Sequence, residues 1–236
     1  MDRSGGHNMP CSPRRRRLGA ALGATLFVSF LALPALADET SDREYRIKAA
    51  FVYNFLKFVE GGRFVVPEVK KKDSDANDAI VIGVLGTPPS RIAFEEFKAK
   101  KVGARPLQVR WFKGLGQLTG EDGNVPSVHP DLDAIRRCHV LFFCPSEKSF
   151  LTPLLSSLRD SDILTVGDVP GFLEAGGVIN LFIEDKKVRF EVNLAAAARA
   201  RLTIRSSLLR MAARTVDHDP VETRDDQEKS GGSSHP

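Results

Sequence analysis

The apolar stretch Ile80-Val81-Ile82-Gly83-Val84-Leu85 decides the fold class of this chain. A run of apolar residues that ends at a turn is typical of a strand buried on both faces of a sheet. Comparable runs recur over 107–112, 138–144 and 163–166, and helical patterns separate them. Strands that alternate with helices predict one α/β domain, with a mainly parallel, doubly wound sheet of about six strands and helices on both faces.

Patterns on either side of these strands predict the remaining elements. A helix is expected over 42–60, where apolar residues recur at helical spacing before Gly61-Gly62. The residues with that spacing are Ile47, Phe51, Phe55 and Phe58. Near the other end, apolar residues over 178–183 and alternating residues over 188–192 predict an antiparallel edge hairpin with its turn at 184–187. Shorter helices are expected over 90–101 (capped by Ser90), 131–137, 149–158, 194–201 and 206–214.

The positive charge of the chain is concentrated at its beginning. The formal net charge is +4, but residues 1–37 carry five arginines and one acid, so the rest of the chain is balanced. Four of these arginines precede an apolar stretch over 18–33 and the sequence Ala35-Leu36-Ala37, which is the pattern of a secretory signal peptide. We expect cleavage after Ala37 and export to the periplasm, with an uncleaved membrane anchor as the alternative. The folded domain is then 38–216, followed by a disordered acidic tail over 217–236.

The sequence is poor in catalytic and metal-binding patterns. It contains no glycine-rich phosphate loop, no G-x-S-x-G and no H-E-x-x-H, so we predict no enzyme activity, no catalytic residue, no cofactor and no metal. Cys138 and Cys144 lie on one expected strand, roughly 20 Å apart, which is too far for a disulfide. They are expected to be two inert, buried thiols. Export and the balanced charge of the body argue against nucleic acid as a partner.

Polar residues at the ends of the expected strands form a first candidate binding site. In an open α/β sheet, ligands bind beyond the carboxyl ends of the parallel strands. Thr87, Ser90, Ser146 and Asp168 follow three of these strands, and we expect them at one rim. Asp168 has two readings, as a catalytic carboxylate or as a residue that stabilises its turn, and the second is favoured because no other carboxylate lies beside it in sequence.

Arginines in the last part of the folded domain form a second candidate site. Between Val192 and Val216 there are five arginines and no acid, namely Arg199, Arg201, Arg205, Arg210 and Arg214. In a helix over 206–214, Arg210 and Arg214 would share one face. Clustered arginines can clamp a carboxylate or phosphate, or contact a partner protein. A solvated helix face is the alternative reading, and the two remain open at this point.

Several segments, taken in order, resemble the YfiR family of periplasmic proteins. The segments are KAAFVYNFLKF (48–58), IGVLG (82–86), CHVLF (138–142), LTVGD (164–168), GGVINL (176–181), VRFEVNL (188–194) and LLR (208–210). Each is weak alone, but the series spans about 43–213 in order, nearly the whole expected body. The chain departs from the family at Glu60-Gly61-Gly62, where many members have Glu-Trp-Pro. It also lacks the extra cysteines that form disulfides in some members, so redox control by a disulfide is not implied.

The resemblance implies a non-enzymatic regulator. In the best-known members, the protein binds the periplasmic part of an inner-membrane diguanylate cyclase and holds it inactive. An outer-membrane lipoprotein titrates it away, which raises cyclic di-GMP and promotes biofilm. Other relatives occur beside or fused to sensor kinases. For this chain the resemblance implies a cyclase or sensor kinase as partner, with an outer-membrane lipoprotein as a further one. A small-ligand sensor for an anionic metabolite, working with a sensor kinase, is the alternative function, and a homodimer stays open.

Overall fold

The computed structural model describes residues 33–65, 79–120 and 123–217, and side chains from Thr40 onward. Most of the predicted signal peptide and the predicted tail after Asp217 lie outside the described residues, and both stay predictions. Ala37, after which cleavage is predicted, lies within the first described helix. Among the described residues, no helix combines the length and the apolar character that crossing a bilayer requires.

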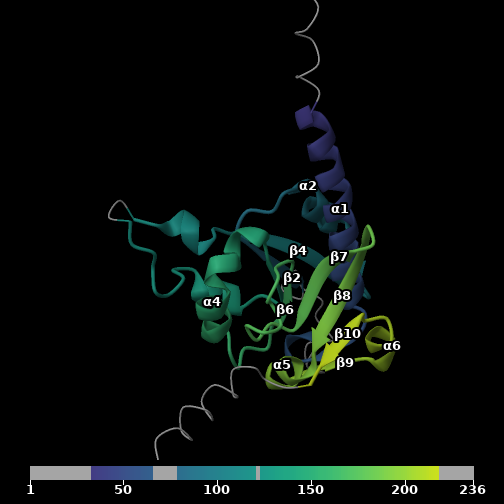
Figure 1. Cartoon of the computed structure of the whole chain (residues 1–236). Helices are drawn as coiled ribbons and strands as arrows, with labels where there is room; N and C mark the ends of the chain where they lie inside the picture. Colours follow the sequence, from purple (N-terminus) through teal and green to yellow (C-terminus); the bar gives the residue numbers. More distant parts are fainter. Residues whose placement is uncertain (1–32, 66–78, 121–122, 218–236) are drawn as a thin grey trace, which may run out of the picture.

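An eight-stranded sheet forms the centre of the molecule, in the order β10-β8-β7-β6-β5-β2-β4-β3 (Figure 1). The strands are β2 (Ile80–Leu85), β3 (Lys101–Val102), β4 (Arg105–Phe112), β5 (Val140–Phe143), β6 (Leu164–Gly167), β7 (Ile179–Glu184), β8 (Lys187–Asn193) and β10 (Arg214–Val216). From β4 to β7 all neighbours are parallel, whereas β8 returns antiparallel to β7. The predicted α/β fold with a mainly parallel sheet and an antiparallel hairpin is confirmed. The hairpin is not the outermost element, because β10 adds parallel to β8.

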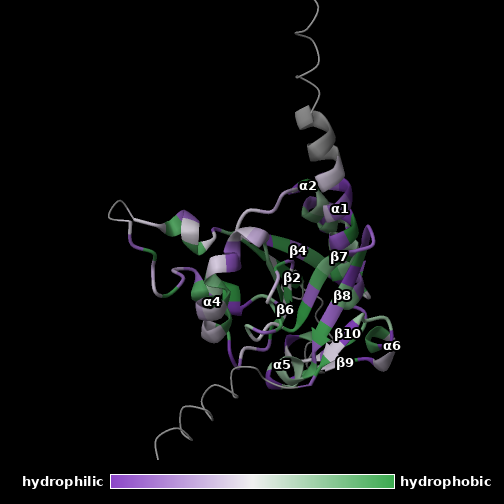
Figure 2. Cartoon of the chain, in the orientation of Figure 1, coloured by the Kyte–Doolittle hydropathy of each residue, from purple (hydrophilic) through white to green (hydrophobic). Residues whose placement is uncertain are grey.

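Helices cover both faces of the sheet, and each face has its own apolar core. On one face α1 (Leu33–Phe55), α2 (Ile92–Glu95) and α5 (Leu194–Arg199) pack around Phe94 and Phe142. On the other face α3 (Leu132–Arg136) and α4 (Leu151–Ser157) pack around Phe143 and Phe172. Figure 2 shows the central strands as the hydrophobic interior between these layers. The layered arrangement explains the continuous apolar runs, since strands buried on both faces need apolar side chains on both.

Helix α1 ends earlier than predicted. It stops at Phe55 rather than near Glu60, because Val59–Gly61 form a short strand, β1. This strand pairs antiparallel with β9 (Leu202–Ile204) in a separate two-stranded sheet. Gly61 adopts φ 88 within that pairing, where a Cβ would lie 2.4 Å from the carbonyl oxygen of Arg201. The predicted role of Gly61-Gly62 as a helix end was therefore wrong.

The buried face of α1 is wider than the predicted stripe. Phe55 is buried as predicted, whereas Ile47 is 42% exposed. The residues of α1 that are buried without having been predicted are Tyr45, Lys48, Ala49 and Val52. One of them is charged, namely Lys48, which is 3% exposed.

The last predicted helix was wrong in its second half. Helix α6 spans only Ser206–Leu209, and the chain then forms β10. The predicted helix over 90–101 is present as α2 followed by a 3₁₀ turn over Glu96–Ala99. Its predicted cap was wrong, because the helix follows Arg91 and no side chain caps it. The Ser90 hydroxyl is buried and has no hydrogen-bond partner among the described residues.

Candidate functional site

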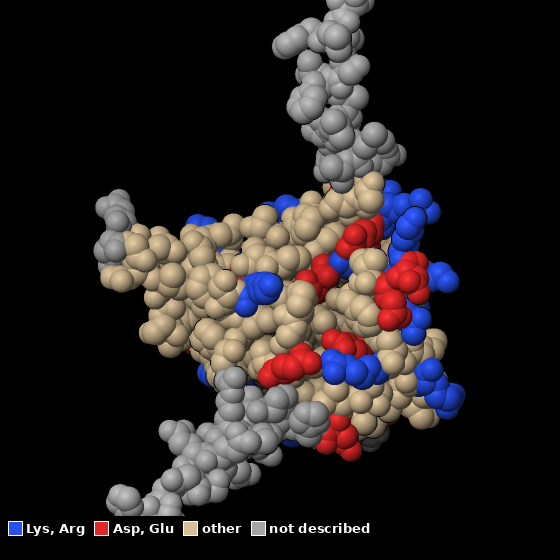
Figure 3. All heavy atoms as spheres, viewed as in Figure 1, with Lys and Arg blue, Asp and Glu red and all other residues tan. Residues whose placement is uncertain are grey.

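A cleft of about 780 Å³ opens beyond the carboxyl end of β6. Its walls come from α1, the loop that follows β6, the hairpin β7–β8 and the first residue of β10. The face of the molecule seen in Figure 3 carries interspersed acidic and basic side chains between α1 and the hairpin. The charged residues that line the cleft are Glu44, Lys48, Asp168, Glu174, Glu191 and Arg214.

Lys48 and Asp168 form a buried ion pair on one wall of the cleft. The side chains are 4% and 10% exposed, and Nζ of Lys48 lies 2.6 Å from Oδ1 of Asp168. The same ammonium also pairs with Glu44, one helical turn earlier. The Tyr45 hydroxyl donates a hydrogen bond of 2.5 Å to Oδ2 of Asp168. Because a buried charge is tolerated only when it is paired and hydrogen-bonded, these contacts hold α1 against the end of β6.

The environment of Asp168 shifts its proton equilibrium. Burial raises the pKa of Asp168, and the hydrogen bonds from Lys48 and Tyr45 act in the opposite direction. Burial also raises the pKa of Tyr45, and the adjacent Asp168 charge adds to that rise. Tyr45 therefore remains protonated and serves as a donor, so the carboxylate is held by an ammonium and a phenol on separate oxygens.

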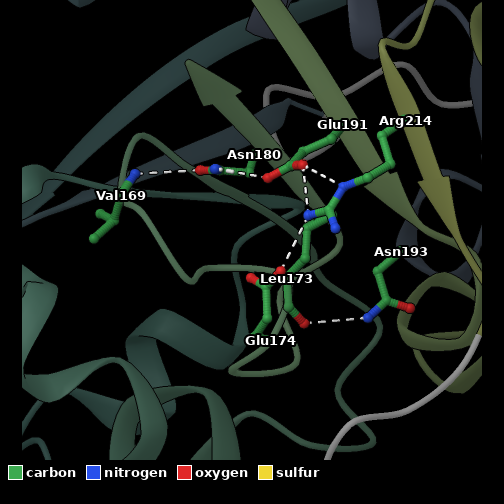
Figure 4. A network of polar contacts seen from close by, with 7 residues as sticks. All are labelled: Val169, Leu173, Glu174, Asn180, Glu191, Asn193 and Arg214. Carbon is green, nitrogen blue, oxygen red and sulfur yellow. Dashed lines mark hydrogen bonds and ion pairs between the residues drawn. The ribbon is translucent and has the colours of Figure 1, made fainter.

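A chain of polar contacts forms the opposite wall (Figure 4). The Val169 backbone N–H donates to Oδ1 of Asn180 at 3.2 Å, and Nδ2 of Asn180 donates to Oε1 of Glu191 at 3.1 Å. Arg214 then joins two carboxylates, with 2.9 Å from its Nε to Oε2 of Glu191 and a 3.0 Å hydrogen bond to Oε1 of Glu174. These contacts connect the loop after β6, the hairpin and the edge strand β10 into one wall.

The cleft carries the same sign of charge as the anionic ligand expected from the sequence, so it does not suit that ligand. Four carboxylates and two cations line it, so carboxylates are in excess. Apolar side chains from the loops and from β7 lie between them, among them Val169, Phe182 and Ile183. Ile183 is 46% exposed. A partly apolar group that carries a positive charge matches this lining better than an anion does.

The neighbouring part of the rim, beyond β2, β4 and β5, is closed by Glu147. This residue is 1% exposed, its Oε2 accepts from the Leu115 backbone N–H at 3.0 Å, and its Oε1 accepts from the Ser146 hydroxyl at 2.8 Å. The Ser146 oxygen also accepts from the Thr87 backbone N–H at 3.0 Å. At Gly114 a Cβ would lie 1.9 Å from Oε1 of Glu147, so any other residue there would displace this carboxylate.

The four predicted rim residues therefore fall in three places. Asp168 lines the cleft. Thr87 and Ser146 are joined to each other in the closed part of the rim. Ser90 is buried, and it is its neighbour Pro89 that lines the cleft. The structure thus brings two of the four together and separates them from Asp168.

The five predicted arginines do not converge. Arg201 pairs with Asp162, Arg205 pairs with Glu60, and Arg214 pairs with Glu174 and Glu191. Arg199 donates to the Gly176 carbonyl at 3.5 Å, and Arg210 is exposed just beyond α6. The predicted sharing of a helix face by Arg210 and Arg214 was wrong, because α6 ends at Leu209. Of the five, only Arg214 lines the cleft.

The two cysteines are buried and free, as predicted. Burial raises the pKa of the Cys138 thiol to about 11, and it also raises the pKa of Cys144. Both are therefore protonated and unreactive near neutral pH. Within the described part of the chain, no group of three or more His, Cys, Asp or Glu side chains is placed to hold a metal ion.

Sequence reasoning missed the residues of α1 that complete the cleft. Tyr45 and Lys48 reach Asp168 across more than a hundred positions of sequence, which no spacing argument links, and Glu44 pairs with Lys48. One signal was present. Lys48 interrupts the stripe that includes Tyr45 and Val52, and a lysine on a buried helix face requires a carboxylate partner from another element.

Comparisons with known proteins add a family and two distant folds. A family model described as YfiR/HmsC-like matches residues 45–213, and no curated protein matches the sequence. Among solved structures, a conserved domain protein from Vibrio cholerae O1 biovar El Tor is similar with a TM-score of 0.44 and 12% identity, over 62% of this chain and 58% of that one. The ABC domain in complex with L-Trp from Streptococcus pneumonia has a TM-score of 0.45 and 14% identity, over 60% of this chain and 56% of that one. This chain thus spans somewhat more than half the length of either structure.

Proposed function

This chain belongs to the YfiR/HmsC-like family, and from that premise we propose that it represses an inner-membrane signalling enzyme from the periplasm by direct contact. Members of the family are known as periplasmic regulators of cyclic di-GMP signalling. The expected partner is the periplasmic domain of a diguanylate cyclase, and a sensor kinase is the alternative. An outer-membrane lipoprotein that releases the enzyme would complete the system. In this proposal the protein acts by binding and has no catalytic role of its own.

The extent of the family match is the observation that carries this proposal. The match begins at Tyr45 in the cleft and ends at Ala213, one residue before β10, so it covers both faces of the sheet. It includes Lys48 and Asp168, which fasten α1 to the sheet. A match of this extent concerns the whole domain rather than one motif. The predicted signal peptide supports the periplasmic location.

The function is tested by deleting the gene and measuring cyclic di-GMP. We expect the level to rise on deletion and to return on expression of the wild-type protein with its first 37 residues. A version that lacks those residues is the matched control, and it should not restore repression. An unchanged level, together with no cyclase recovered with the tagged protein, would contradict the cyclase proposal. Recovery of a sensor kinase would support the alternative partner.

The contact face is tested by crosslinking in intact cells. Exposed apolar residues offer positions for a photoreactive side chain on different elements without disturbing the core. They are Ile47 on α1, Ile92 on α2, Val128 in the loop before α3, Ile183 on β7 and Met211 after α6. A single contact face predicts adducts from one or two neighbouring positions. Equal adducts from all five would indicate non-specific capture and would contradict a defined interface.

A second function, small-ligand sensing, is favoured by the cleft itself. Its volume of about 780 Å³ suits a small molecule, and polar groups converge on it from two walls. Thermal-shift screening of nucleotides, amino acids and amines should then give a saturable rise in melting temperature. The charge of the lining predicts that amines score above anions. A response that survives Asp168→Asn together with Glu191→Gln would place the ligand elsewhere and contradict this site.

A further inference from the structure

Strand β7 extends past the end of the strand beside it. Strand β6 pairs with β7 only from Ile179 to Asn180, whereas β8 pairs with β7 from Ile179 to Glu184. The four residues over 181–184 therefore lie beyond β6, and they span about 13 Å. Among the described residues, no strand pairs with them on the β6 side. The sheet thus has an open strand edge where the hairpin reaches beyond its neighbour (Figure 1).

The hydrogen bonds of the hairpin show which backbone groups face this open edge. The N–H of Asn193 on β8 donates to the Val178 carbonyl at 2.8 Å, so the backbone of Val178 faces β8. Along an antiparallel pair, successive residues face the partner strand and the opposite side alternately. Phe182 therefore faces β8 like Val178, and Ile183 directs its N–H and C=O to the open edge.

The chain that follows β6 does not pair with this edge. After Gly167 the Asp168 N–H donates to the Phe143 carbonyl at 3.3 Å, and the Val169 N–H donates to the Asn180 side chain at 3.2 Å. Both N–H groups are thus bonded to partners other than the backbone of β7 beyond Asn180.

The open edge lies within the cleft. Leu181, Phe182 and Ile183 line it, and the other lining residues come from α1, from the loop after β6 and from the wall that contains Arg214. A strand edge that is flanked in this way can be reached by a single extended segment. The edge of a second sheet would meet the flanking walls.

The two edges of the hairpin differ in how they are protected. On the outer edge, β8 presents the exposed charges of Lys187 and Arg189, and such charges on edge strands discourage pairing with another chain. On the inner edge, the residues before Glu184 are Leu181-Phe182-Ile183, without a charge, and Ile183 is 46% exposed. Only the edge inside the cleft is therefore suited to accept a further strand.

The charges of the cleft indicate the class of segment that fits. The side chains of an added strand would point alternately to the two sides of the sheet. One side carries Glu44 on α1, and the other carries Glu174 and Glu191. Because carboxylates exceed cations in the lining, a segment with basic side chains complements it.

The remaining segments of this chain do not match that charge. Residues 217–236 contain six acids and two basic residues, and residues 66–78 contain four acids and three lysines. The arginines over 14–17 precede the predicted cleavage site after Ala37. The complementary segment therefore belongs to another protein.

We propose that the cleft binds an extended, basic segment of a partner protein, which adds to the open edge of β7 as a further strand. Backbone hydrogen bonds to Ile183 contribute affinity, and the carboxylates select basic side chains. The inference rests on the contact with a partner protein proposed above and names the surface that makes it. Its test uses peptides without any enzyme, so failure of strand addition and failure of regulation appear in separate experiments.

Matched proline variants test the backbone contact. Ile183 and Val188 lie opposite each other in the hairpin. The Phe190 carbonyl accepts from the Ala213 N–H at 2.8 Å on the outer edge, so Val188, two residues earlier, faces that edge as well. Ile183→Pro therefore removes an N–H from the edge in the cleft, and Val188→Pro removes one from the outer edge.

The probe is a fluorescent peptide of about six alternating lysine and valine residues, long enough to cover the open edge. It is titrated into the purified mature protein at low salt, and binding is measured by fluorescence anisotropy. We expect Ile183→Pro to weaken binding about tenfold and Val188→Pro to change it less than about twofold, since only the first removes a hydrogen bond to the peptide. Circular dichroism of both variants checks that they fold.

Two further peptides test the wild-type protein and do not depend on the folding of a variant. A lysine–valine peptide methylated on every backbone nitrogen keeps its side chains but cannot donate, so it should not bind. An alternating glutamate–valine peptide should bind at least tenfold more weakly, because it meets carboxylates of the same charge. The proposal is overturned if the wild type does not bind the lysine–valine peptide, if either further peptide binds as well, or if the two folded proline variants bind alike.

Discussion

Glu147 and Asp168 both follow the carboxyl ends of neighbouring strands, β5 and β6, yet one closes the rim and the other lines a cleft. The partners of Glu147 are a backbone N–H and a serine hydroxyl from adjacent loops. The partners of Asp168 are Lys48 and Tyr45, which reach it from α1. Loop backbone fills the space around the first carboxylate, whereas long side chains span the space around the second. Position at the end of a parallel strand therefore does not by itself create a binding site.

The largest effect is expected when Glu147 is changed to Ala. The change leaves the Leu115 N–H buried without its acceptor and creates a cavity beside Gly114. We expect a loss of about 3 kcal/mol in the free energy of unfolding, measured by urea denaturation. The control is Glu96→Ala, which removes an exposed carboxylate and should cost less than about 0.5 kcal/mol. Equal losses would show that Glu147 does not hold the rim.

A smaller loss is expected for Asp168→Asn. Lys48 then keeps only Glu44 as a charged partner, so we expect the free energy of unfolding to fall by about 2 kcal/mol in urea denaturation. This loss is smaller than the one expected for a buried charge that is left wholly unpaired. The double variant Lys48→Met with Asp168→Leu removes both charges and should recover most of this loss. If the double variant is less stable than Asp168→Asn, the ion pair contributes more than its burial costs.

The carboxyl group of Asp168 should also affect the pH dependence of stability. An acid whose pKa is raised by folding binds more protons in the folded state, so stability falls as pH rises through the window between its unfolded and folded pKa. For Asp168 that window begins at the ordinary aspartate value of about 3.9 and extends upward. Unfolding of the wild type measured from pH 4 upward should show this fall more steeply than Asp168→Asn does. An identical slope in both proteins would exclude Asp168 as its source.

The smallest effect is expected at the outer wall of the cleft. Arg214 is half exposed, so Arg214→Gln should cost about 0.5–1 kcal/mol even though it ends the contacts with Glu174 and Glu191. Arg189→Gln, at a similarly exposed ion pair outside the cleft, is the control. The two variants should have similar stability, but only Arg214→Gln should change the thermal shift produced by a ligand. An equal change of that thermal shift in both variants would show that the cleft wall does not contribute to ligand binding.

The central sheet could be predicted from the sequence because its strands are defined by local composition. The boundaries predicted for β2 are those observed, and the cores of β4, β5 and β6 also lie within their predicted segments. Buried strands need apolar residues throughout, whatever their neighbours are.

The strands β1, β9 and β10 could not be predicted in this way. Each has three residues, includes polar or charged ones, and exists only because a distant segment supplies its hydrogen bonds. Arg214 illustrates the consequence for the candidate site. Its sequence context favoured a helix, but pairing with β8 places it on the cleft wall beside Glu191. Asp168 lines the cleft at the strand end where the sequence placed it. The surroundings of Thr87 and Ser146 could not be predicted, because Glu147 fills the space there.

The pairing of β1 with β9 has a consequence for how quickly the protein folds. Glu60 and Arg205, which pair beside these strands, are 145 positions apart in the sequence. Closing a chain loop of that length costs about 4 kcal/mol of entropy before any contact compensates for it, and such distant pairings slow folding. A chain that emerges N-terminus first therefore cannot fasten α1 through β1 until the segment that forms β9 has emerged as well. The cleft would be completed only when β10 follows, so the wall that contains Arg214 would form in the last step of folding.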